Sequence, residues 1–257
     1  MIVDYNKNII DNIHDLVPAV KIQIAMYEAY GIEGIIAYEE TAKYAKSKGL
    51  LVIGDIKRGD IGNTATAYAS HLTGIKIKEQ VINTWTEDMI TVNPYLGKDS
   101  LEPFKKACES TGKGCFVLVK TSNPGSADIQ DLTPTGQEKT IYEIVAEMVS
   151  DIGADSIGSM GYSLIGAVVG ATHPDIGTKL RKMMPHTFFL VPGYGAQGAT
   201  AGDIQGFYDR NGRGVIINSS RGIIANWRKD PKYSENNIGD AARDAVLAMK
   251  HDIREKL

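Results

Sequence analysis

Short apolar segments rich in β-branched residues alternate with longer amphipathic segments along this chain. Such alternation predicts parallel strands joined by helices that cover the outside of the sheet. We expect strands at residues 19–22, 50–56, 89–93, 115–120, 165–169, 188–192 and 215–218. We expect helices at residues 35–47, 101–108, 140–151, 176–184, 204–208 and 239–256. The pattern therefore favours an α/β barrel.

The number of expected strands is one short of the eight that close a (β/α)8 TIM barrel. The chain opens instead with a helical pattern at residues 6–16, with apolar residues at Ile9, Ile10, Ile13 and Leu16. We therefore predict a TIM barrel that lacks its first strand in this chain, either by natural loss or because the sequence begins downstream of a natural start. Such a barrel has two unpaired sheet edges.

Composition and length are those of one large domain. The chain has 257 residues and no Pro/Ser-rich linker, so we expect a single barrel domain over residues 1–257. A net charge of -3 gives no reason to expect nucleic acid or an acidic membrane surface. No apolar run approaches the ~20 residues that span a bilayer. Cys108 and Cys115 lack a CxxC spacing and are interpreted as reduced core thiols, so we expect a cytoplasmic protein.

Charged residues stand at the end of the second expected strand. Asp55 and Lys57 are two residues apart, so both side chains point to the same face of an extended strand, and Asp60 follows in the loop. Lys21 lies in the first expected strand. The strands of a parallel barrel end at one rim, where barrel enzymes carry their chemistry. These residues therefore predict a site, with a structural ion-pair network as the alternative interpretation.

A second group of candidate residues follows the last two expected strands. Residues 192–198 are glycine-rich, and Arg221 and Gly222 come after the last strand. Loops at these positions of a barrel often bind phosphate, glycine lets the backbone approach an anion, and a guanidinium matches phosphate geometry. We therefore expect a phosphorylated ligand, although residues 192–198 could form only a tight turn. His173 is interpreted as a loop residue rather than a general base.

The run Asp-x-Lys-x-x-Asp-Ile-x-x-Thr resembles the signature of the orotidine 5′-phosphate decarboxylases. It is matched at Asp55, Lys57, Asp60, Ile61 and Thr64. The resemblance continues through residues 15–31, 91–100, 120–126, 168–174 and 192–198, so it covers essentially the whole chain and is similar to the longer bacterial branch. It implies a (β/α)8-barrel homodimer that converts orotidine 5′-monophosphate to UMP and carbon dioxide in pyrimidine biosynthesis, with no metal and no cofactor.

The resemblance also implies roles for the charged residues. Lys57 would donate a proton to C6 of the pyrimidine, and Asp55 would lie beside the departing carboxylate. Lys21 would complete the charge network and reach the ribose. Asp60 would be delivered into the active site of the partner subunit, so that the homodimer shares its active sites.

Further substrate contacts follow from the same resemblance. Thr64 would reach the ribose across the dimer interface, Ser122 would contact the pyrimidine, and Gln197 and Arg221 would hold the 5′-phosphate. The full set of expected substrate-binding residues is Thr64, Ile61, Ser122, Pro192, Gln197, Arg221 and Gly222.

Two alternative functions stay open. Relatives that resemble 3-keto-gulonate 6-phosphate decarboxylase and hexulose-phosphate synthase share the barrel and the motif but use magnesium. They place a carboxylate where this chain has Lys21, which argues against a metal site here. The other alternative is a non-catalytic barrel that binds a phosphorylated ligand. Lys57 argues against it, and one departure from the family pattern keeps it open, because no Gly-Leu-Asp-Pro-like turn precedes Lys21. From this departure we expect weaker ribose binding and lower stability.

Overall fold

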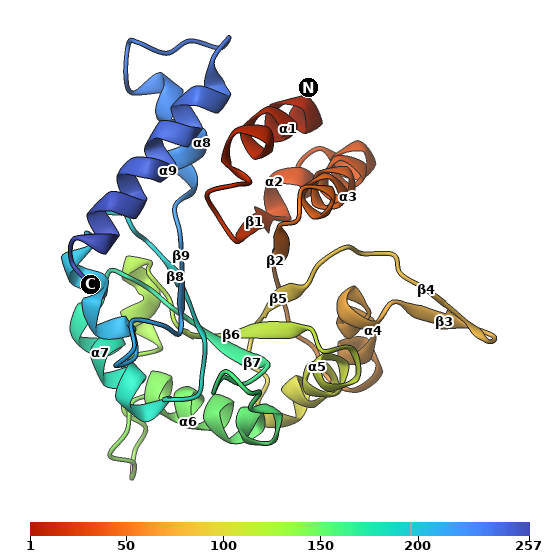
Figure 1. Cartoon of the computed structure of the whole chain (residues 1–257). Helices are drawn as coiled ribbons and strands as arrows, with labels where there is room; N and C mark the ends of the chain where they lie inside the picture. The colour runs from red at the N-terminus through yellow and green to blue at the C-terminus, as the bar shows by residue number, and fades with distance from the viewer. Residues whose placement is uncertain (196) are drawn as a thin grey trace.

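The computed structural model describes residues 1–195 and 197–257, and a curved sheet of seven parallel strands forms its centre (Figure 1). In spatial order the strands are β1 (Ala19–Gln23), β2 (Leu51–Arg58), β5 (Met89–Val92), β6 (Gly114–Lys120), β7 (Ile165–Val169), β8 (Phe189–Pro192) and β9 (Val215–Asn218). In the described residues β1 pairs only with β2, and β9 only with β8. The predicted seven-stranded barrel is confirmed, with a seam between its first and last strands.

Helices follow most strands and cover the outside of the sheet. The α-helices are α1 (Ile2–Ile13), α2 (Ala25–Glu28), α3 (Gly31–Ser47), α4 (Gly62–Thr73), α5 (Lys98–Thr111), α6 (Ile141–Gly153), α7 (Pro174–Met183), α8 (Ser220–Ile224) and α9 (Ile238–Arg254). The 3-10 helices are η1 (Pro124–Asp128), η2 (Ala154–Ser156), η3 (Gly202–Phe207) and η4 (Asn226–Arg228). Within the described ranges, no helix combines the length and apolar character needed to cross a membrane.

The observed elements differ from the predicted ones in several places, most clearly in η3, in α4 and in a short hairpin. The expected α-helix at residues 204–208 is the 3-10 helix η3. The sequence pattern did not predict α4, whose buried face includes the small residues Ala65 and Ala69 and so carries a weak hydrophobic signal. It also missed an antiparallel hairpin of β3 (Ile75–Ile77) and β4 (Gln80–Ile82), in which every residue is exposed.

Apolar side chains form two layers on the two faces of the sheet. Inside the barrel, a buried cluster joins Ile53, Phe116, Val168 and Leu190 from four different strands. A larger cluster fills the space between the sheet and its helices. Because strand side chains alternate between faces, Asp55, which stands two positions after Ile53, also points into the barrel interior. The inner cluster therefore forms a floor beneath the carboxyl ends of the strands.

Helices α1 and α9 pack together beside the seam, where no strand pairing joins β1 to β9. Buried Ile9 and Ile13 of α1 contact Ala242 and Val246 of α9. Arg243 of α9 binds both carboxylate oxygens of Asp15 at 2.7 and 2.8 Å and donates to the Asn12 carbonyl. Figure 1 shows α1 and α9 as neighbours, although they lie at opposite ends of the sequence. Helix packing thus links the two ends of the sheet.

Arg181 of α7 is a buried cation held by backbone carbonyl groups. Its guanidinium donates to the carbonyls of Phe207, Met184, Thr187 and Gly214 at 2.7–3.2 Å. Burial lowers the pKa of Arg181 to about 10, although Tyr162 and Asp209 act in the opposite direction. Thr187 and Gly214 precede β8 and β9, so Arg181 holds the beginnings of two adjacent strands.

We predict that Arg181→Ala destabilises the protein by at least about 3 kcal/mol, since four buried carbonyls lose a charged donor. Lys182→Ala is the matched control, because Lys182 is exposed on the same helix, and its effect should stay within about 0.5 kcal/mol. Urea denaturation of both variants measures the difference. A cost below about 1 kcal/mol for Arg181→Ala would show that Arg181 does not hold the beginnings of β8 and β9 in place.

Candidate active site

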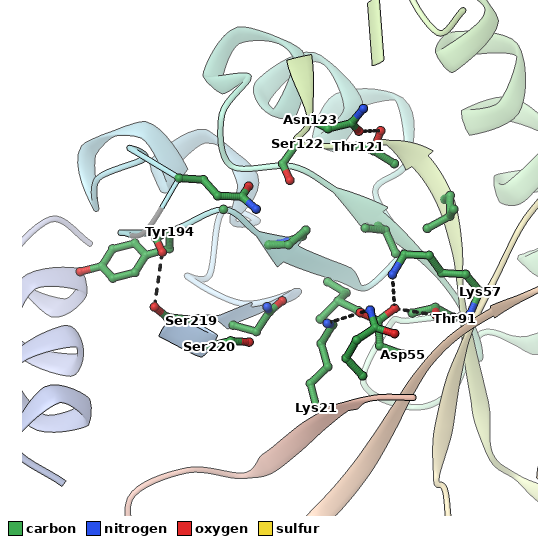
Figure 2. A pocket seen from close by; sticks show the side chains of 18 of the residues that line it. Lys21, Asp55, Lys57, Thr91, Thr121, Ser122, Asn123, Tyr194, Ser219 and Ser220 are labelled. Carbon is green, nitrogen blue, oxygen red and sulfur yellow. Dashed lines mark hydrogen bonds and ion pairs between the residues drawn. The ribbon is translucent and has the colours of Figure 1, made fainter. Parts of the chain in front are cut away.

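A cavity of about 470 Å³ opens at the carboxyl ends of the strands. That volume lies in the range typical of small-molecule sites. Its lining includes seven of the residues predicted from the sequence, which are Lys21, Asp55, Lys57, Ser122, Pro192, Gln197 and Arg221. Figure 2 shows the charged group at one side of this cavity, and Tyr194 with Ser219 at another. The parallel topology thus gathers residues from segments that are far apart in sequence.

The Asp55 carboxylate is the centre of the charged group. Asp55 is only 4% exposed, and each of its oxygens accepts two hydrogen bonds. Oδ2 is bound by the Lys21 ammonium and by Gln23 Nε2, the latter at 2.8 Å. Oδ1 is bound by Lys57 Nζ at 2.5 Å and by Thr91 Oγ1 at 3.0 Å. These four donors satisfy the accepting capacity of the carboxylate.

The charge state of Asp55 is set by two opposing effects. Burial by itself raises the pKa of the Asp55 carboxyl, because it disfavours the ionised form. The ammonium groups of Lys21 and Lys57 favour the ionised form and prevail, so the pKa lies below its ordinary value of 3.8. Asp55 is therefore a carboxylate at neutral pH, and it carries one negative charge between two positive ones.

The backbone of β2 departs from regular strand geometry at Lys57. Lys57 has a φ of 46°, which is rare for a residue other than glycine, and the pairing with β5 shifts register between Gly54 and Arg58. The Lys57 amide donates to Thr91 Oγ1 at 2.9 Å. Backbone strain of this kind is often found at functional sites. Here it leaves the Lys57 side chain 45% exposed at the cavity while its ammonium still contacts Asp55.

The remaining lining belongs mainly to loops after β6, β8 and β9. Gly193 has a φ of 110°, so the turn after β8 requires glycine. Gln197 and Arg221 are exposed and bring an amide and a guanidinium to the cavity. Ser219 Oγ donates to the Tyr194 carbonyl at 3.4 Å, which joins the loops after β8 and β9. Ala196 of the predicted glycine-rich segment lies outside the described residues.

Four predicted site residues do not line this cavity. Asp60 is half-buried, and its carboxylate accepts from the Ile61 amide at 2.8 Å, beside the start of α4. Ile61 is 56% exposed, and Thr64 is exposed on the first turn of α4. Gly222 follows Arg221 in α8 but is not part of the lining. One chain by itself therefore brings Asp60, Ile61 and Thr64 to its surface rather than to its own cavity.

Several polar residues of the cavity were not among the predicted site residues, including Gln23, Thr91 and Asn218. Gln23 and Thr91 bind Asp55, and Asn218 lies at the end of β9. The signal for Gln23 was available, since it stands two positions after Lys21 in the same strand and shares its face. Asn218 is likewise the last residue of a predicted strand. Thr91 lies within an otherwise apolar strand and offered no such signal.

The fold and the cavity define a barrel enzyme whose charged site lies at the carboxyl ends of parallel strands. The family model described as Orotidine 5'-phosphate decarboxylase / HUMPS family matches residues 4–234. The chain therefore belongs to that family. Its activity is that of an orotidine-5′-phosphate decarboxylase (EC 4.1.1.23) of pyrimidine biosynthesis, and the identification made from the sequence is confirmed.

Individual relatives support this assignment. The chain is 47% identical over 254 residues to the orotidine 5'-phosphate decarboxylase of Petrotoga mobilis, covering 98% of this chain and 84% of the relative. It is 44% identical over 258 residues to that of Clostridium tetani, covering 100% and 85%. The solved structure of Leishmania donovani OMP decarboxylase superposes with a TM-score of 0.79 at 30% identity, covering 99% of this chain and 87% of that one.

The low pKa of Asp55 predicts a pH-dependent contribution to stability. Because the folded pKa lies below the unfolded value of about 3.9, ionised Asp55 stabilises the native state above about pH 4. This stabilisation is lost as the pH falls through the folded pKa. Asp55→Asn should therefore cost more stability at pH 7 than at about pH 3.5, as measured by urea denaturation at both pH values.

The control for this measurement is Glu235→Gln, which removes an exposed carboxylate that does not line the cavity. Its effect should be small and nearly the same at both pH values. An equal or greater cost of Asp55→Asn at the lower pH would show that Asp55 is not held ionised by its lysines.

Proposed function

We propose that Lys57 is the proton donor in the decarboxylation of orotidine 5′-monophosphate. The observation that carries this assignment is the Asp55 carboxylate, which contacts the ammonium groups of both Lys21 and Lys57. This contact holds the Lys57 ammonium group beside a fixed negative charge, at the cavity where the substrate would bind. The Lys57 side chain is also the more exposed of the two, at 45% against 16% for Lys21.

The chemistry explains why an ammonium group is needed. The bond between C6 and the carboxylate carbon breaks, carbon dioxide leaves, and the electron pair stays on C6 as a vinylic carbanion. That carbanion has no conjugated electron sink. A fixed ammonium stabilises the developing charge in a water-poor site and then transfers its proton to C6, which gives UMP. The lysine recovers a proton from solvent.

Asp55 and Lys21 support this step in different ways. In the proposed complex, Asp55 lies beside the substrate carboxylate, and like-charge repulsion is relieved when carbon dioxide leaves. Lys21 balances the buried Asp55 charge and reaches toward the ribose. Both Asp55 oxygens already accept from protein donors, so this carboxylate is poorly suited to bind a magnesium ion. This donor set supports a reaction without metal or cofactor.

The loops supply the proposed contacts to the rest of the substrate. Ser122 contacts the pyrimidine, and Gln197 and Arg221 hold the 5′-phosphate. Pro192 and Gly222 shape the loops that carry Gln197 and Arg221. The phosphate lies far from the reacting carbon. Its binding energy then positions the ring for the chemical step.

We propose that two chains share their active sites in a homodimer. Asp60, Ile61 and Thr64 belong to the family motif but lie outside the cavity of their own chain. Delivery into a neighbouring cavity would place Asp60 beside Lys57 and Thr64 near the ribose. We also propose that residues 1–257 act as one barrel domain and that the enzyme works in the cytoplasm, as its metabolic role suggests.

Lys57→Ala should lower turnover about a thousandfold or more, because proton donation and charge stabilisation are lost together. An ultraviolet assay of orotidine 5′-monophosphate loss measures turnover, and a binding assay with UMP checks that the site is still formed. The wild-type rate should be unchanged by EDTA. Robust turnover by Lys57→Ala would rule out its role, and inactivation by EDTA would favour the magnesium-dependent branch.

Mixing Lys57→Ala chains with Asp60→Asn chains should restore about one quarter of wild-type activity. Random exchange makes half of the dimers mixed, and each mixed dimer then holds one intact site of two. The matched control mixes Lys57→Ala with Asp55→Asn, whose defects lie in the same chain's cavity, and should restore nothing. Absence of recovery after verified subunit exchange would contradict the shared site.

A further inference from the structure

Lys120 is a fully buried cation that the proposed mechanism does not use. It is the last residue of β6 and is 0% exposed. Its ammonium pairs with Asp131 Oδ1 at 2.6 Å and lies 5.7 Å from the centre of the Tyr142 ring. Lys120 does not line the cavity, yet the next three residues, 121–123, all do. An ion pair between a fully buried lysine and a carboxylate that is 39% exposed therefore lies directly behind a loop of the active site.

Strand geometry explains why Lys120 lies outside the cavity. Phe116 belongs to the cluster inside the barrel, and Leu118 lines the cavity, so strict alternation would place Lys120 in the interior as well. The pairing of β6 with β7 instead shifts register between Leu118 and Lys120. Lys120 contacts Tyr142, which belongs to the cluster between the sheet and the helices. A lysine in that layer requires a compensating carboxylate, which Asp131 supplies.

Gln130, the residue before Asp131, also binds the loop of residues 121–123. Gln130 Oε1 accepts from the Thr121 amide at 3.0 Å, and Gln130 Nε2 donates to Thr121 Oγ1 at 2.8 Å. The Gln130 carbonyl in turn accepts from the Tyr142 amide at 3.0 Å, which ties this segment to α6. The adjacent residues Gln130 and Asp131 therefore hold the adjacent residues Thr121 and Lys120.

Ser122 is held from the opposite side by the loop after β7. Thr172 Oγ1 donates to the Ser122 carbonyl at 3.1 Å. A Cβ atom at Gly170 would lie 2.8 Å from Ser122 Cα, so the two backbones approach as closely as glycine permits. Burial first and the Lys120 charge second lower the pKa of His173, which lies in the same loop. The loops after β6 and β7 therefore meet at Ser122.

We propose that the Lys120–Asp131 ion pair positions residues 121–123 so that Ser122 meets the pyrimidine ring. Lys120 and Asp131 are positioning residues, since neither lines the cavity. The inference rests on the proposed contact of Ser122 with the ring. It assigns the ion pair to the ring end of the substrate and not to the phosphate end, where Gln197 and Arg221 act.

Asp131→Asn tests this assignment, because it keeps the shape of the side chain and leaves Lys120 without a carboxylate. We expect the dissociation constant of UMP to rise about tenfold, and kcat/KM for orotidine 5′-monophosphate to fall by a similar factor. The dissociation constant of ribose 5-phosphate, which has no ring to meet Ser122, should change less than about twofold. Asp128→Asn is the matched control, since Asp128 is exposed in the same segment and should affect neither ligand.

A second variant separates position from stability. Lys120→Met/Asp131→Leu replaces the pair by apolar side chains, which can preserve folding, and it should show the same selective loss of UMP affinity. Unchanged affinity for both ligands, or equal loss for both, in whichever variant folds would overturn the proposal. Failure of the wild-type protein to bind UMP or to turn over orotidine 5′-monophosphate would instead contradict the proposed function itself.

Discussion

The active site depends on one buried carboxylate that holds two lysines in contact with it. Asp55 is ionised although it is buried, because Lys21 and Lys57 offset the cost of removing its charge from water. The dependence runs in both directions, since without Asp55 the two ammonium groups would repel each other. Gln23 and Thr91 complete the shell and fix the orientation of the carboxylate. Asp55 therefore sets both the positions of the two lysines and the balance of charge at the reacting centre.

The barrel keeps this arrangement although its first and last strands are not paired. Helices α1 and α9 join the two ends of the sheet through a small apolar cluster and the Arg243–Asp15 ion pair. Arg181 holds the beginnings of β8 and β9 through backbone carbonyls. Both devices lie outside the cavity, so the residues that bind substrate do not also have to close the fold. This separation suits a site built mostly from loops.

The sequence predicted the strands and the charged cluster well, because both follow from simple periodicity. The seven predicted strands form the seven-stranded sheet. The two-residue spacing of Asp55 and Lys57 correctly predicted that their side chains lie together. The prediction failed where a side chain's surroundings matter more than its own type. Thr91 binds Asp55 only because β5 lies beside β2, and α4 buries small residues that give a weak periodic signal. The local sequence of a strand does not specify which distant segment lies beside it.

Two strands end in irregular geometry, and the two irregularities place lysines in opposite environments. In β2 the register shift and the positive φ at Lys57 leave its ammonium at the cavity beside Asp55. In β6 the shift before Lys120 moves its ammonium out of the cavity and into the layer beneath the helices. A lysine at the cavity keeps part of its solvation, whereas Lys120 keeps none. Asp131 therefore becomes a requirement of the fold at that position, and the loop carrying Asp131 is held against the residues that line the site.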